Sequence, residues 1–293
     1  MSNALSLTSA PQSVVRRALL CGAALCGVLL CGTSAQAQPS ALPGTIARVK
    51  PAVVIVGSYN PTGAPRFSLR GTGFVVGAGN WVVSNAHVLQ QSGSADTAGQ
   101  LVVQVRTGPD TFQTRLAQVL DKDVFHDLAL LHIDGPPVPV LLLGDSDRIK
   151  EGQELAFMGF PIGGALGFSS VTHRAMVSSI TQARLPSARG SQLNAEAIRG
   201  LREGNFQIFQ LDATAYPGNS GGPLFDAVSG EVVGVMNMVL LKGTRESALS
   251  QPSGISYAIP ARHVRDMLAR RVGSAELPLK AEHAQGPEGQ SQQ

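Results

Sequence analysis

Short apolar or alternating segments, separated by turns, recur along most of this chain and predict β-strands. They lie at residues 52–56, 67–76, 81–84, 101–105, 111–119, 128–131, 154–160, 171–181, 206–211, 231–238 and 254–259. A helical turn is expected at residues 45–50. One longer helix is expected to begin at Pro260, because Val264, Met267 and Leu268 then recur with helical spacing. Since strands and helices do not alternate, the pattern predicts an all-β fold with one C-terminal helix.

Three closely spaced prolines mark a boundary inside this series of strands. Pro136, Pro137 and Pro139 cannot continue a central strand. We therefore expect two halves, at residues 38–135 and 136–272, and a further strand that begins just after the boundary, at residues 141–143. Long loops are expected at residues 182–205 and 242–253, and a disordered tail is expected within residues 273–293.

The first 37 residues have the pattern of a secretion signal. Arg16 and Arg17 precede an apolar run at residues 19–31, and Ala35-Gln36-Ala37 fits a cleavage site. The apolar run is short for a membrane span. We therefore expect export to the periplasm or the medium with cleavage after Ala37, and an uncleaved anchor is the alternative.

Cysteine content and charge narrow the class of protein. Cys21, Cys26 and Cys31 all lie in the signal, so the exported chain is expected to have no disulfide and no cysteine metal site. The net charge of the 293 residues is +3, and no basic stripe with aromatic residues occurs. The sequence therefore predicts no nucleic-acid binding and, after signal cleavage, no stable membrane insertion.

The stretch Tyr216-Pro217-Gly218-Asn219-Ser220-Gly221-Gly222-Pro223 holds one serine among three glycines and two prolines. This composition excludes a regular helix or strand and is typical of a tight turn with an exposed hydroxyl. A nucleophilic serine needs that exposure, together with backbone N–H groups that hold an oxyanion. Taken alone, the stretch is equally typical of an ordinary turn between strands.

Two upstream residues are candidates for a catalytic triad with Ser220. His87 follows an apolar strand, and Asp127 stands directly before another, where a carboxylate needs a partner. Asp121 and Asp123 are expected to be solvated loop residues, and His126 is expected at the rim. In an α/β-hydrolase, a helix follows the serine, and the acid and the histidine come later in the chain. Here a valine-rich strand follows, and the order His, Asp, Ser fits a site between two β-barrels.

Six motifs occur in the order Gly71-Thr72-Gly73-Phe74, Ser84-Asn85-Ala86-His87-Val88, Asp127-Leu128-Ala129-Leu130-Leu131, Leu143-Gly144-Asp145-Ser146, Pro217-Gly218-Asn219-Ser220-Gly221-Gly222-Pro223 and Gly254-Ile255-Ser256-Tyr257-Ala258-Ile259-Pro260. Through these motifs and their order, the chain resembles trypsin-like serine proteases, and more closely the protease domain of HtrA/Deg-type enzymes. The resemblance covers about residues 42–272. It implies two six-stranded antiparallel β-barrels followed by a C-terminal helix.

The resemblance also implies roles for the candidate residues. Ser220 would attack the scissile carbonyl, His87 would act as general base, and Asp127 would hold the imidazole. The N–H groups of Gly218 and Ser220 would form the oxyanion hole. The implied protein is an exported serine endopeptidase for unfolded or damaged proteins, without metal or cofactor. The alternative is a latent or non-catalytic polypeptide-binding protein of chaperone type on the same fold.

Further expectations concern specificity and assembly. Thr214 would lie at the base of the primary specificity pocket, so cleavage after Lys or Arg is not expected. Met236 near the pocket wall favours small or medium aliphatic residues, and Tyr216 would line or block the cleft. The two long loops are similar in position to the family's activation loops. Residues 273–293 are too few for the family's usual PDZ domain. Residues 38–58 lack the aromatic residues that family trimers use, which leaves monomer or trimer open.

Overall fold

The computed structural model describes residues 41–90, 99–109, 111–161, 168–183, 206–237 and 254–272. The predicted signal peptide with its cleavage site, the predicted tail and nearly all of the two long loops lie outside these residues. Within the described residues, no helix is long and apolar enough to cross a membrane.

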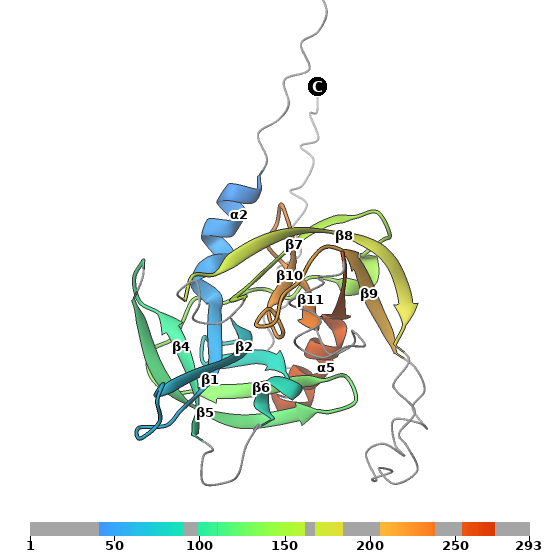
Figure 1. Ribbon diagram of the computed structural model, residues 1–293. Coiled ribbons are helices and arrows are strands. Elements are labelled where there is room, and N and C mark those ends of the chain that lie inside the picture. The colour runs from blue at the N-terminus through green and yellow to red at the C-terminus, as the bar shows by residue number, and fades with distance from the viewer. Residues whose placement is uncertain are drawn as a thin grey trace, which may run out of the picture. The chain divides into compact units, whose positions relative to one another are not determined.

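Twelve strands and a few helices make up the described chain. Figure 1 shows how these elements are arranged. The first part contains α2 (Leu42–Val49), η1 (Lys50–Ala52), β1 (Val53–Tyr59), β2 (Phe67–Val76), β3 (Trp81–Asn85), η2 (His87–Leu89), β4 (Gln100–Arg106), β5 (Phe112–Asp123) and β6 (Leu128–Ile133). The second part contains η4 (Ser146–Arg148), β7 (Glu154–Gly159), β8 (Val171–Gln182), β9 (Gln207–Asp212), β10 (Pro223–Asp226), β11 (Val232–Asn237), β12 (Ile255–Pro260) and α5 (Arg262–Val272).

The strands close into two antiparallel barrels. The first barrel has the neighbour order β1-β2-β3-β6-β5-β4, and the second has the order β10-β11-β12-β9-β8-β7. The two barrels therefore repeat one topology, with the same pattern of neighbours shifted by six strands. The prediction of an all-β fold with two six-stranded antiparallel barrels and a C-terminal helix is confirmed.

Three clusters of buried apolar side chains hold this arrangement together. One belongs to the first barrel and another to the second. The third contains residues of both barrels and of α5, among them Ile55, Met158 and Met267. Neighbouring residues of β1 serve different clusters, because a strand turns successive side chains to opposite faces. Val54 belongs to the first-barrel cluster and Ile55 to the shared one. The shared core fixes the two barrels against each other, and the candidate site draws residues from both.

The segment after the prolines is not the strand that the sequence predicts. It makes a single isolated bridge, between Leu143 and Val232. Leu141 N–H donates to Val75 O at 2.9 Å in the first barrel, and Gly144 N–H donates to Val232 O at 2.8 Å in the second. Because the segment divides its hydrogen bonds between two barrels, it cannot form a continuous ladder in either.

Two further elements differ from the sequence prediction. β10 begins at Pro223 and was not expected, since a four-residue strand that opens on proline looks like a continuation of the glycine turn. The C-terminal helix begins at Arg262 instead of Pro260. Pro260 still belongs to β12, where it pairs with Gly234, and Ala261 N–H continues the strand pairing by donating to Val233 O at 2.9 Å.

Candidate active site

Ser220 follows a type II turn formed by Tyr216, Pro217, Gly218 and Asn219. Asn219 N–H donates to Tyr216 O at 2.9 Å, and Gly218 has φ +104. Proline is favoured at the second position of such a turn, and glycine is required at the third. The turn's own hydrogen bond uses the N–H of Asn219, so that of Gly218 takes no part in it. The sequence order Pro-Gly therefore dictates which amide closes the turn.

Both barrels bind the backbone of this turn and of the residues that follow it. On the side of the first barrel, Thr72 N–H donates to Ser220 O at 2.8 Å, and Thr72 Oγ1 donates to Gly218 O at 2.6 Å. On the side of the second barrel, Gly221 N–H donates to Met236 O, and Met236 N–H donates to Gly222 O, both at 2.9 Å. The backbone around Ser220 is thus bonded to β2 and β11 at once, and Ser220 is 5% exposed.

His87 and Asp127 come from two different connections of the first barrel and are in direct contact. His87 opens η2 directly beyond β3, and Asp127 ends the turn between β5 and β6. His87 Nδ1 lies 2.5 Å from Asp127 Oδ2, and His87 N–H donates to Asp127 Oδ1 at 2.8 Å. Because the backbone and the ring of His87 bind the two carboxylate oxygens separately, the rotation of both side chains is fixed. The other ring nitrogen, Nε2, points away from this contact.

Close backbone packing connects the His87 segment to the serine turn. A Cβ on Gly221 would lie 2.1 Å from Thr72 O and 2.3 Å from Ser84 Oγ, in the strand that leads to His87. A Cβ on Gly71 would lie 2.9 Å from Ser220 O. Only glycine fits at these contacts. The structure therefore brings His87 and Asp127 together and packs the turn of Ser220 against the segment that leads to His87.

Three more residues hold Asp127, in roles that were not predicted from the sequence. Asn237 Nδ2 donates to Asp127 Oδ2 at 2.7 Å, from the end of β11 in the second barrel. Asn85 Nδ2 and Ala86 N–H both donate to Asp127 O, at 3.0 and 3.1 Å. Asn237 is 1% exposed. The signal in the sequence that could have identified Asn237 is its place at the end of a valine-rich strand, because a buried amide needs hydrogen-bond partners.

The three predicted specificity residues lie around the same turn in different environments. Thr214 is partly buried. Ser256 Oγ binds both neighbours of Thr214, because it accepts from Ala215 N–H at 3.0 Å and donates to Ala213 O at 2.7 Å. Met236 is completely buried within the second-barrel cluster.

Tyr216 is partly buried, and its ring centroid lies 6.2 Å from that of His173 on β8. The His173 ring in turn stacks on Phe157 of β7. Tyr216 is thus associated with the β7–β8 side of the second barrel.

The turn before Asp127 carries a second histidine–aspartate pair, contrary to the prediction that Asp123 is a solvated loop residue. His126 Nδ1 lies 2.8 Å from Asp123 Oδ2, and their side chains are 20% and 15% exposed. Asp123 is the last residue of β5, because this strand continues past the predicted end at residue 119. Burial raises the pKa of Asp123, but the hydrogen bonds from His126 and the charges of His126 and Arg270 together outweigh burial, so the pKa is lowered. Asp123 therefore stays ionised in this partly buried place.

The lowered pKa of His263, on α5, should make the stability of the protein depend on pH. Burial, and then the neighbouring His126 and Arg262, lower the pKa of His263 from 6.5 to about 3. Between about pH 3 and pH 6.5, this histidine binds a proton in the unfolded chain but not in the folded chain. We expect the free energy of unfolding to fall from pH 7.5 to pH 5, and to fall less in His263→Phe. Urea unfolding at the two pH values measures this, and equal losses in both proteins would contradict it.

Among the residues that the structure describes, no group of three or more His, Cys, Asp or Glu side chains could hold a metal ion. The candidate site contains an imidazole, a carboxylate, a hydroxyl and oriented backbone amides. Such a set can carry out nucleophilic acyl transfer with proton transfer through the imidazole.

Comparison with known proteins shows which family the chain resembles. The profile of the trypsin-like peptidase domain matches residues 71–235. Serine protease HTRA2, mitochondrial, of Bos taurus is 32% identical over 243 residues, which cover 81% of this chain and 44% of that protein. A probable periplasmic serine endoprotease DegP-like of Marinomonas sp. is 32% identical over 202 residues, which cover 69% of this chain and 35% of that protein. The chain thus spans less than half the length of these two relatives.

The fold is also similar to solved structures. That of the HtrA-type protease AlgW with tripeptide superposes with a TM-score of 0.56 at 27% sequence identity. The match covers 79% of this chain and 63% of that one.

Proposed function

Because the chain belongs to the trypsin-like peptidase family and is of the HtrA type, we propose that it is an exported serine endopeptidase. Its substrates are unfolded or damaged polypeptides, and the reaction passes through a covalent acyl-enzyme. The observation that carries this proposal is the 2.5 Å contact between His87 Nδ1 and Asp127 Oδ2, beside the turn that holds Ser220.

The proposed reaction follows from the hydrogen bonds of His87. Asp127 accepts a hydrogen bond from Nδ1–H, so the lone pair of the neutral ring is on Nε2. Nε2 takes the proton of Ser220 Oγ while the oxygen attacks the scissile carbonyl, and then gives it to the leaving amine. Asp127 stabilises the imidazolium between these steps. A water molecule, activated by the same Nε2, then hydrolyses the acyl-enzyme.

The oxyanion is proposed to bind the N–H groups of Gly218 and Ser220. The type II turn supports this role for Gly218, because it directs the intervening N–H of Asn219 to Tyr216 O instead. Backbone donors fixed in this way need no reorganisation when negative charge develops on the carbonyl oxygen. The two barrels thus hold the donors in place before the substrate arrives.

Replacing Gly218 with alanine tests this arrangement. A Cβ there would lie 2.1 Å from Phe160 O, a backbone atom, and φ is +104, so the turn must move. We expect kcat to fall by about 10²–10³-fold, as for loss of one oxyanion donor. Gly152→Ala is the matched control, because Gly152 also has a positive φ, +82, but nothing lies within 4 Å of its Cβ position. Similar kcat values for the two variants would contradict the role of Gly218.

The substrate class follows from what the reaction requires. The scissile bond must come within about 3–3.5 Å of Ser220 Oγ in a fixed orientation. Peptide groups inside a folded protein are held in hydrogen-bonded strands and helices, whereas an unfolded chain can present an extended segment. The side chain before the cut would lie near Thr214 and Met236, which carry no charge, and Tyr216 would line its approach. Small or medium aliphatic side chains suit these neighbours better than Lys or Arg.

The proposed function can be tested with residues 38–293 and an unstructured casein-like substrate. We expect fragmentation of the unstructured substrate and not of a stably folded protein, and complete inhibition by a serine-reactive phosphonate. Mass spectrometry of the fragments should show cuts mainly after aliphatic residues. A protein that leaves the casein intact but prevents its aggregation would have the alternative, chaperone-like function. Cuts dominated by Lys and Arg would contradict the proposed specificity.

A further inference from the structure

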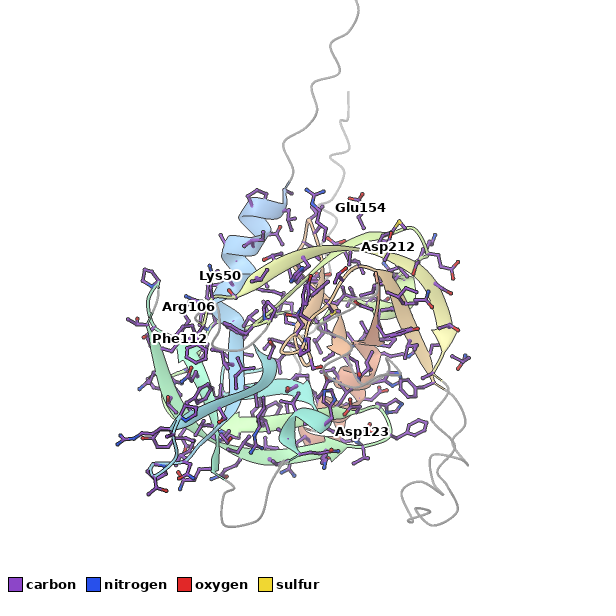
Figure 2. All side chains as sticks on the ribbon, in the orientation of Figure 1. Lys50, Arg106, Phe112, Asp123, Glu154 and Asp212 are labelled. Atoms are coloured by element: carbon purple, nitrogen blue, oxygen red, sulfur yellow. The ribbon has the colours of Figure 1, made fainter. Side chains whose placement is uncertain are left out.

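The turn that ends at Asp127 is closed by Asp123. Asp123 Oδ1 accepts from His126 N–H at 3.0 Å, Asp123 Oδ2 contacts the His126 ring at 2.8 Å, and Asp127 N–H donates to Val124 O at 3.3 Å. Asp127 itself has φ +53. Residues other than glycine rarely adopt this left-handed conformation, so the surroundings must hold it. Figure 2 labels Asp123 at the end of β5, where this turn begins.

The C-terminal helix α5 packs on the same turn. The His263 ring stacks on the His126 ring, with centroids 3.9 Å apart and 23° between the planes. Phe206 places its ring edge-on to both imidazoles, at 4.8 and 5.7 Å. Arg270 Nη2 lies 3.7 Å from Asp123 Oδ2. The His126 ring is therefore held by a hydrogen bond from its own turn and by aromatic contacts from two other segments.

Charged groups also lie near this stack. From α5, Arg262 Nε donates to His263 Nε2 at 3.4 Å, and Arg262 Nη1 donates to Asp147 Oδ1 at 2.9 Å. From β5, Asp121 lies 3.8 Å from Arg270. Because His263 Nε2 accepts this hydrogen bond, the ring must be neutral there. The stack therefore consists of the neutral imidazole of His263 and the imidazole of His126, which contacts Asp123.

We propose that His126 is a positioning residue, which fixes the backbone of Asp127 so that its carboxylate meets His87. Asp127 is bound on both sides of its Cα atom. Its carbonyl oxygen accepts from Asn85 and Ala86 of the first barrel, and its N–H belongs to the turn that His126 holds. If the turn that holds the Asp127 N–H were loosened, the carboxylate of Asp127 would lose its fixed geometry toward His87. The proposal rests on the catalytic role of Asp127 in the proposed function.

The test uses the full chain with three substitutions in the hairpin that contains Asp127. His126→Phe keeps an aromatic ring for the stack and the backbone hydrogen bond to Asp123, but removes the side-chain hydrogen bond. His126→Asn restores a side-chain N–H near the position of Nδ1. His132→Phe is the matched control, because His132 lies in β6 with its side chain 37% exposed and pairs with Asp134 instead.

We expect His126→Phe to lower kcat about tenfold with KM changed less than twofold, because misplaced catalytic groups slow chemistry more than binding. The acid limb of the pH profile of kcat/KM should move to lower pH, since a displaced Asp127 stabilises the imidazolium less. His126→Asn should recover most of the loss, and His132→Phe should match the wild type. A His126→Phe protein with unchanged kcat would overturn the proposal, as would a lower kcat with an unmoved pH profile and no recovery in His126→Asn.

The proton NMR signal of His87 Nδ1–H supplies a readout that does not depend on hydrolysis. In the wild type this proton should resonate far downfield because of its short hydrogen bond to Asp127. In His126→Phe it should shift upfield or broaden, and His263→Ala provides the same test if His126→Phe does not fold. An unchanged signal would overturn the positioning role. A protein that shows this shift but no Ser220-dependent hydrolysis would contradict the proposed function alone.

Discussion

Replacing Ser220 with alanine is expected to lower kcat for peptide hydrolysis by about 10⁶-fold, the loss typical of a missing nucleophile in a serine protease. The Ser220 hydroxyl supplies the attacking oxygen, and Thr72 fixes the backbone beside it through the carbonyl groups of Gly218 and Ser220. The backbone of the turn should not change, because alanine has the conformational range of serine and Ser220 is held through its main chain. Initial rates on a quenched fluorescent peptide measure the effect.

Ser68→Ala is the control for this substitution, because it makes the same change on an exposed residue of β2. Its kcat should equal that of the wild type. Hydrolysis by Ser220→Ala at more than a small fraction of the wild-type rate would exclude Ser220 as the nucleophile, provided that the two proteins unfold at the same temperature.

Replacing Asp127 with asparagine is expected to lower kcat by about 10⁴-fold. The carboxylate accepts hydrogen bonds from the ring and the backbone of His87 and from Asn237. An amide has one acceptor oxygen where the carboxylate has two, and it would favour the wrong tautomer of the imidazole. Asparagine tolerates the left-handed conformation of this position, so the turn should persist.

The matched control is Asp134→Asn, whose side chain is 69% exposed at the end of the same hairpin. It should keep the wild-type rate. The pH dependence of the residual activity of Asp127→Asn distinguishes a tautomer effect from unfolding, because activity should rise at high pH, where neutral imidazole and hydroxide can contribute. A kcat within tenfold of the wild type would contradict the role of Asp127.

The architecture could be predicted because its signals are local in sequence. Alternating valines identify the strands, three prolines separate the two sets, and the order of His87, Asp127 and Ser220 selects the two-barrel arrangement. The turn before Ser220 is likewise encoded locally, since Pro217 and Gly218 satisfy the backbone angles that a type II turn requires.

Features that depend on distant contacts could not be predicted in this way. Asn237 reaches Asp127 across 110 positions of sequence, and its partner is decided by the packing of the two barrels. His126 and His263 stack only because α5 returns to the β5–β6 turn. β10 was missed for the opposite reason, because its local pattern of glycines and a proline indicates a turn and only pairing with β7 and β11 makes it a strand.

The most direct test of the account is covalent labelling with a serine-reactive phosphonate, followed by peptide mapping. A serine hydroxyl reacts with such a reagent when a neighbouring base activates it and an oxyanion site holds the phosphoryl oxygen. We expect one adduct, on Ser220, that is absent in Ser220→Ala and forms far more slowly in Asp127→Asn. A folded wild-type protein that forms no adduct, or forms it on another residue, would contradict the account.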